Sequence, residues 1–207
     1  MLLYLPVLVE ECTSTPLFTN INSTAFAEFQ KKMYDKSYPN KRYKHTIQFL
    51  KKHVPESATI LDLGVENPFS KMMSSEGFKV ENTKGEDLDL DASAIKNSEA
   101  EVVTAFEIFE HLLSPFTVLN AIQSNKLVAS IPLRLWFSSA YRSKTDMRDR
   151  HFHEFEDWQF DWLLEKAGWE IKARQKWTNP TKKIGIRPLL RWITPRYYIV
   201  YAERINN

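Results

Sequence analysis

Short apolar runs alternate with amphipathic stretches along the chain from residue 58 onward. Six runs are typical of strands: ATILDLG (58–64), FKVENT (78–83), EVVTAFEIF (101–109), KLVASIPL (126–133), WEIKARQKW (169–177) and RYYIVYAERI (196–205). Three intervening segments predict helices: PFSKMMSSEG (68–77), FTVLNAIQ (116–123) and EFEDWQFDWLLEKAG (154–168). This alternation predicts an α/β sandwich around a largely parallel sheet. The last two runs follow one another without a clear helix and predict an antiparallel edge hairpin.

Local signals refine two of the predicted helices. Ser114 and Pro115 supply an N-cap residue and a proline at the first helical position of the helix over 116–123. In the helix over 154–168, Phe155, Trp158 and Trp162 recur at helical spacing. We therefore expect these three aromatic side chains to face the core.

The chain before the first of these strands has a different pattern. Amphipathic helices are predicted over 22–36 and 41–53, which indicates an N-terminal helical cap over residues 1–55 and an α/β domain over 56–207. The first ten residues, MLLYLPVLVE, are apolar but lack a basic region and a small-residue cleavage site. We interpret them as an edge strand or packing segment and not as a signal peptide.

Composition narrows the class of protein. The chain has 207 residues, of which 43% are hydrophobic, enough for a sizeable core. The single cysteine, Cys12, excludes an internal disulfide and a cysteine-based zinc cluster, and it favours a reducing, cytoplasmic location. No apolar run approaches the ~20 residues that a membrane helix requires, so we predict no membrane association.

Charge is unevenly distributed, although the formal net charge is only +2. Residues 170–196 contain eight Lys or Arg and one acidic residue. Such a stretch can face phosphate, anionic lipid or an acidic substrate, and it can equally be a solvated basic face. Nucleic-acid binding or modification through 170–196 is the least favoured function, because near-neutral overall charge predicts little non-specific affinity.

Candidate chemistry gathers at three predicted strand ends, 62–64, 83–91 and 105–111. In an open α/β sheet, ligands bind beyond the carboxyl ends of the strands. Asp62 stands at the first end, and Asp87 at the second can accept from an amine or from ribose hydroxyls. Phe106 and Glu107 stand at the third. The bland alternatives are that Asp62 caps the following helix, that Asp87 belongs to a solvated turn, and that Glu107 pairs with a nearby base.

The ordered series of motifs resembles the class I S-adenosylmethionine-dependent methyltransferases, small-molecule branch. ILDLG resembles the family's first strand and glycine loop, and TAFEIFEHLLSPFTVLNAI is similar to its segment xxxEVLEHLxxPxxxLxxI. LVASIPL resembles its fifth strand, and HFHEFEDWQFDWLLEKAGWEI the stretch leading into its sixth. The resemblance covers about 56–204. It implies a Rossmann-like sandwich with a mostly parallel seven-stranded sheet, and methyl transfer to a small-molecule acceptor.

The resemblance also implies roles for individual residues. S-adenosylmethionine would be the cofactor, with Asp62 and Gly64 near its methionine part, Asp87 and Leu88 beside adenine, and Phe106 and Glu107 near the sulfonium. His111, His151 and His153 are the candidate general bases, because histidine titrates near working pH. Tyr141 and Arg142 lie in a polar stretch after LVASIPL, the segment that resembles the family's fifth strand, and they are candidate substrate contacts.

Two features qualify these roles. His151-x-His153 could hold a metal ion, but no third ligand is placed by the sequence, and packing explains these histidines as well; we predict no metal. Glu66 and Pro68 stand where the family loop has glycines, and Lys84 stands where its ribose-binding acid is expected. Proline removes a backbone donor. The alternative function is therefore a methyltransferase-like binding or scaffold protein without catalysis.

Overall fold

The structure is a computed structural model that describes residues 40–146, 149–181 and 184–205. Six strands form one sheet in the order β2-β1-β3-β4-β6-β5. Their bounds are β1 Thr59–Asp62, β2 Lys79–Asn82, β3 Val102–Phe106, β4 Lys126–Pro132, β5 Trp169–Thr178 and β6 Pro195–Arg204. The first four strands pair in parallel, and β6 runs antiparallel to both β4 and β5. The predicted Rossmann-like α/β architecture with a mostly parallel sheet is confirmed.

The predicted number of seven strands is not reached in the described part of the chain. Between β2 and β3, where a further strand could lie, the chain forms turns and the short helix α4 (Ser93–Lys96). The first ten residues, predicted as an edge strand or packing segment, and the helix predicted over 22–36 lie outside the described residues.

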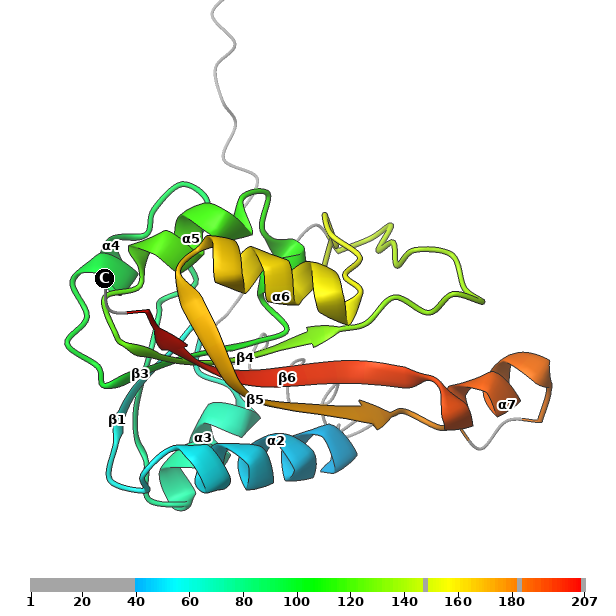
Figure 1. Cartoon of the computed structure of the whole chain (residues 1–207), viewed down its shortest axis with the longest axis horizontal. Helices are drawn as coiled ribbons and strands as arrows, with labels where there is room; N and C mark the ends of the chain where they lie inside the picture. The colour runs from blue at the N-terminus through cyan, green and yellow to red at the C-terminus, as the bar shows by residue number, and fades with distance from the viewer. Residues whose placement is uncertain (1–39, 147–148, 182–183, 206–207) are drawn as a thin grey trace, which may run out of the picture. The chain divides into compact units, whose positions relative to one another are not determined.

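Helices cover both faces of the sheet (Figure 1). α2 (Asn40–His53) and α3 (Pro68–Ser75) lie on one face, and α5 (Pro115–Ala121) and α6 (Asp157–Lys166) lie on the other with α4. Each central strand supplies both cores by alternation. For example, Ile60 packs with the α2 side and Leu61 with the α5 side. A strand that is buried on both faces reads as a continuous apolar run, which is why these strands could be recognised in the sequence.

The chain divides into two compact units after Lys41. From Arg42 onward, α2 belongs to the α/β unit, and Tyr43, Ile47 and Leu50 are buried against the sheet and α3. The predicted helix over 41–53 is therefore observed, and its apolar side is the one that packs. The division of the chain into a cap over 1–55 and a domain over 56–207 stays a prediction.

The prediction for the aromatic side chains of α6 is wrong at two of three positions. Phe155 is buried, but Trp158 and Trp162 are 45% and 64% exposed. The inner stripe of α6 consists of Phe160 and Leu164, both fully buried. Trp158 and Trp162 are themselves four residues apart, so they form a second stripe on the outer side, with ring centroids 4.8 Å apart. Helical spacing alone does not tell which stripe faces the core.

The C-terminal hairpin is present, but its connection contains a helix that the sequence reading missed. α7 (Ile186–Ile193) lies between β5 and β6 and has no buried residue. The basic stretch 170–196 runs along this hairpin. Within it, Lys172, Arg174 and Lys176 pair with acidic side chains on β5 and α6. In the part of the chain that the structure describes, none of the helices has the length and apolar character needed to cross a membrane.

Candidate active site

The carboxyl ends of β1, β2 and β3 hold a buried polar cluster around Asp62. The Asp62 side chain is 2% exposed. Its Oδ1 accepts a hydrogen bond from Thr104 Oγ1 at 2.7 Å, and its Oδ2 accepts one from Asn82 Nδ2 at 3.1 Å. Burial raises the pKa of Asp62 to about 7, and the two hydrogen bonds oppose that rise. Asp62 therefore joins three neighbouring strands, and both its oxygens are engaged within the protein.

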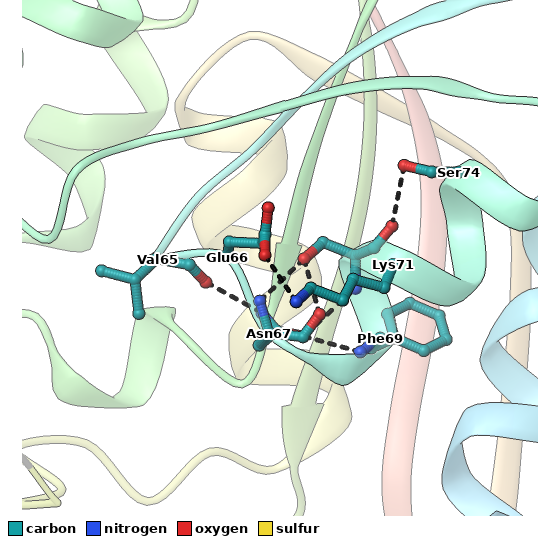
Figure 2. A network of polar contacts seen from close by, with 7 residues as sticks. Val65, Glu66, Asn67, Phe69, Lys71 and Ser74 are labelled. Atoms are coloured by element: carbon teal, nitrogen blue, oxygen red, sulfur yellow. Dashed lines mark hydrogen bonds and ion pairs between the residues drawn. The ribbon is translucent and has the colours of Figure 1, made fainter. Parts of the chain in front are cut away.

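The loop after β1 uses its own polar groups. Gly64 has a φ of +113°, and its N–H donates to Thr83 Oγ1 at 2.7 Å. Asn67 is the N-cap residue of α3, and its Oδ1 accepts from the N–H groups of Phe69 and Ser70. Ser70 Oγ accepts in turn from Asn67 N–H, which completes a capping box. Figure 2 shows this closed network together with the exposed ion pair between Glu66 and Lys71.

Side chains also lie against the glycines of this region. A Cβ atom on Gly64 would meet Ile108 Cδ1 at 3.6 Å, and one on Gly85 would meet Val65 Cγ1 at only 2.8 Å. The loop after β1 thus packs on the loop after β2 through Val65. Together with Pro68 at the first position of α3, this packing leaves the loop unlike an open cradle of backbone N–H groups.

A partly buried ion pair joins α2 to the end of β3. Arg42 Nη1 lies 3.2 Å from Glu107 Oε2, and both side chains are partly buried. Ser130 Oγ on β4 donates to Glu107 Oε1 at 2.9 Å. Glu107 has a φ of +58°, a conformation that non-glycine residues adopt uncommonly. Such strain persists where the surroundings hold it, and it is frequent at functional sites.

Aromatic rings surround this ion pair. The Arg42 guanidinium lies 5.8 Å from the Tyr43 ring centroid and 5.6 Å from that of Tyr197. Phe69 contacts both Tyr43 and Phe106, with ring centroids 4.9 Å and 5.2 Å apart. Burial raises the pKa of Tyr197, with Glu107 contributing. The ion pair therefore brings a cation and a carboxylate together beside several ring faces that favour positive charge.

A second polar group follows directly along the chain, in the 3-10 helix η1 (Phe109–His111). Glu110 is 1% exposed, and its pKa is raised well above the usual range by burial and by the neighbouring Glu107. His111 Nε2 lies 3.7 Å from Glu110 Oε1. The His111 and His151 rings meet edge to face, with centroids 4.7 Å apart. His153 lies apart from this pair and stacks on Phe155.

A pocket of about 400 Å³ opens beside His151. Its lining includes Tyr141, Arg142, Lys144 and Arg150, so it carries both an aromatic ring and several cationic groups. The Tyr141 hydroxyl donates to Asp149, and the Tyr141 N–H donates to Glu154 Oε1. The two residues predicted as substrate contacts thus lie together at a pocket that His151 also lines.

Asp87 and Leu88, the candidate residues after β2, have surroundings that differ from those of Asp62. Leu88 is buried in the core on the α5 side. Asp87 is exposed, and its Oδ1 accepts from the N–H of Asp89. Asp89 in turn accepts from the N–H groups of Leu113 and Ser114. These hydrogen bonds therefore fix the turn against the residues that precede α5.

Sequence reasoning missed several residues that contact the candidate site residues. Arg42, Asn82, Thr104 and Ser130 all contact a predicted residue, Asp62 or Glu107. Asn82 is the last residue of β2, a position that could have marked it, whereas Thr104 and Ser130 lie two residues before the ends of β3 and β4. Arg42 gave no such signal, because it belongs to a helix that the sequence assigned to the N-terminal cap.

Comparison with known proteins establishes the fold. No family model matches the chain, and no curated protein matches its sequence. Solved structures do match, at low sequence identity. The Burkholderia thailandensis 1,6-didemethyltoxoflavin-N1-methyltransferase, solved with 1,6-didemethyltoxoflavin and S-adenosylhomocysteine, is 16% identical with a TM-score of 0.52, over 97% of this chain and 99% of that one.

Two further structures agree with this result. A proposed S-adenosylmethionine-dependent methyltransferase from Listeria monocytogenes is 14% identical with a TM-score of 0.55, over 80% of this chain and 99% of that one. An Archaeoglobus fulgidus S-adenosylmethionine-dependent methyltransferase is 14% identical with a TM-score of 0.50, over 78% and 94%. The chain therefore has the fold of the S-adenosylmethionine-dependent methyltransferases, as its motifs predict.

Proposed function

We propose that the chain is an S-adenosylmethionine-dependent methyltransferase that acts on a small molecule. The observation that carries this proposal is the Arg42–Glu107 pair with its aromatic surroundings, at the strand ends of a methyltransferase fold. S-adenosylmethionine carries a sulfonium cation next to a zwitterionic amino acid group. When bound, it supplies a methyl group that is activated for displacement by a nucleophile.

The residues present fit this cofactor through their side chains, and the loop after β1 contributes little. The N–H groups of Gly64, Phe69 and Ser70 are already engaged within the protein, so a carboxylate would have to displace Thr83 or Asn67 from them. Arg42 is the group that can hold the methionine carboxylate, since its guanidinium offers several donors.

The positive groups of the cofactor have complementary partners beside Arg42. Glu107 is a carboxylate, and the rings of Tyr43, Phe69 and Phe106 favour positive charge. Asp62 stays a structural link below this region. For the adenine end we retain Asp87 as an exposed acceptor at the end of β2, with Leu88 behind it.

The pocket beside His151 is where we place the methyl acceptor. Its volume of about 400 Å³ is in the range of small-ligand sites. Arg142, Lys144 and Arg150 line it and favour an acceptor with negative charge. His151 is a competent proton acceptor because burial, with His111 next, lowers its pKa and keeps the imidazole neutral.

A second candidate function is a binding or scaffold protein without catalysis. The closed network at the start of α3 favours it, because the N–H groups of Phe69 and Ser70 are bonded to Asn67. This candidate predicts no measurable affinity for S-adenosylmethionine or S-adenosylhomocysteine.

Calorimetric titration with each of the two compounds distinguishes these functions. We expect sub-millimolar affinity for both. Arg42→Ala should weaken binding about tenfold or more, as expected for a lost charge-assisted hydrogen bond. Arg134→Ala is the matched control, since Arg134 is exposed and makes only a 4.0 Å ion pair.

Three results would count against the proposal. If neither compound gives binding heat with the folded wild-type chain, the enzymatic function is excluded, and the binding or scaffold function remains. Tighter binding of either compound by Arg42→Ala would show that Arg42 hinders cofactor binding. Equal losses in Arg42→Ala and Arg134→Ala would show that the effect is general. Circular dichroism of each variant confirms that the fold is intact.

A further inference from the structure

Three side chains form a cluster with the composition of a metal site. Glu110, His111 and His151 each bring one ligand atom, and these atoms all lie within 4.8 Å of one another. Glu110 is buried, and among the described residues its Oε2 has no hydrogen-bond partner. An unpartnered buried carboxylate oxygen is costly and needs an explanation. A bound cation supplies one.

The hydrogen bonds around His111 orient it as a ligand. His111 Nδ1 lies 3.0 Å from the carbonyl oxygen of Arg150. A carbonyl oxygen only accepts, so Nδ1 carries the proton in this bond, and in neutral His111 the lone pair is on Nε2. That atom faces Glu110 Oε1 at 3.7 Å, beyond hydrogen-bond distance. Histidine ligands of metals commonly donate their other ring N–H to a backbone carbonyl in this way.

The backbone holds the third ligand against the first two. The N–H groups of Phe152 and His153 both donate to the carbonyl oxygen of Glu110, at 2.8 Å and 3.2 Å. These bonds fix the chain around His151 directly beside η1. The cluster is therefore supported by main-chain contacts between two segments that are distant in sequence, and it does not depend on flexible surface side chains.

We propose that Glu110, His111 and His151 bind a divalent first-row transition-metal ion of the zinc type. Imidazole suits this class of metal, whereas magnesium and calcium prefer all-oxygen sites. Three protein ligands leave a coordination position open, as in catalytic zinc sites. His151 also lines the pocket of Tyr141, Arg142 and Arg150, so we place the open position on the pocket side.

An occupied site would change the chemistry of the pocket. A metal ion lowers the pKa of a bound water or hydroxyl group by several units. An acceptor hydroxyl on a metal held by these three residues would then release its proton to water, without a free histidine as base. This consequence rests on the proposed function, whereas the metal site itself does not.

Metal binding is measured with the full chain, free of any affinity tag and treated with a chelator, in the absence of S-adenosylmethionine. Co²⁺ is titrated as a spectroscopic probe and then displaced by Zn²⁺, with calorimetry for the stoichiometry. We expect one ion per chain, with visible absorption of Co²⁺ bound to nitrogen and oxygen ligands. Glu110→Gln and His151→Ala should each weaken binding at least tenfold.

His153→Ala is the matched control for metal affinity, because His153 is near in sequence but stacks on Phe155 away from the cluster. It should bind Co²⁺ like the wild type. The proposal is overturned if the wild type binds neither ion, or if His153→Ala loses binding while His151→Ala keeps it. If Glu110→Gln does not fold, His151→Ala decides alone, since His151 lies at the edge of the pocket. Loss of S-adenosylmethionine affinity would leave this result untouched.

Discussion

Asp62→Asn tests the electrostatics of the polar cluster at the strand ends. Burial raises the pKa of Asp62 from 3.8 to about 7. The folded protein therefore binds this proton more tightly than the unfolded chain does. The stabilisation is fully present below the unfolded pKa and is lost as the pH rises to about 7. At about 1.4 kcal/mol per pKa unit, the loss amounts to about 4 kcal/mol.

The variant removes this pH dependence because asparagine does not titrate. It keeps an oxygen for Thr104 Oγ1, but its amide group meets Asn82 Nδ2 in place of an acceptor. Loss of that hydrogen bond costs about 1 kcal/mol. We therefore expect Asp62→Asn to be less stable than the wild type only below about pH 4.5, and slightly more stable than it at pH 5. At pH 8 it should be more stable by roughly 3 kcal/mol.

Urea unfolding at pH 5, 6, 7 and 8, followed by circular dichroism, measures both free energies of unfolding. The difference between variant and wild type should change by about 1.4 kcal/mol per pH unit between pH 5 and pH 7. Asp91→Asn is the control, because a hydrogen bond from Ser93 lowers the pKa of Asp91, so that its effect should not vary with pH between 5 and 8. A difference for Asp62→Asn that does not vary with pH would refute the reasoning.

Two further predictions concern the loops beside this cluster. Asn67→Ala removes the acceptor of two N–H groups at the start of α3 and should cost about 1 kcal/mol of unfolding free energy in urea titration; an unchanged value would show that water replaces the cap. Gly85→Ala places a Cβ 2.8 Å from Val65 Cγ1 at a φ of +87° and should lower the melting temperature. Val65→Ala in the same chain should recover the steric part only, and full recovery would show that the backbone angle costs nothing.

The fold could be predicted because the central strands β1, β3 and β4 are buried on both faces. All six predicted strands are observed within a few residues of their expected bounds. β1, β3 and β4 come from continuous apolar runs, whereas the edge strands β2 and β5 have exposed positions at regular intervals. α7 escaped prediction for the converse reason. It buries no side chain, and its sequence IRPLLRWI follows no pattern that the core imposes.

The candidate site could be predicted only where the chain order itself places a residue at a strand end. Asp62, Phe106 and Glu107 were found in this way. Arg42 was not, because its relation to Glu107 depends on how α2 lies across the sheet. The sequence places Glu110 just after a predicted strand but does not predict that it is buried. Its burial depends on the packing of 150–153 against η1.

The start of α3 shows why a sequence departure at a binding loop can be read in two ways. The N–H groups at a helix N-terminus can be satisfied by a ligand's anion or by the chain's own capping side chain, and the two compete for the same donors. Asn67, Pro68 and Ser70 satisfy them from within, so this end of the crevice is stable without a ligand. Under the proposed function, a bound carboxylate then finds its partner elsewhere, in Arg42, a partly buried cation that pairs with Glu107. Under the proposed function, the missing glycines of the loop and Arg42 on α2 are two parts of one arrangement, in which a side chain holds the carboxylate in place of backbone N–H groups.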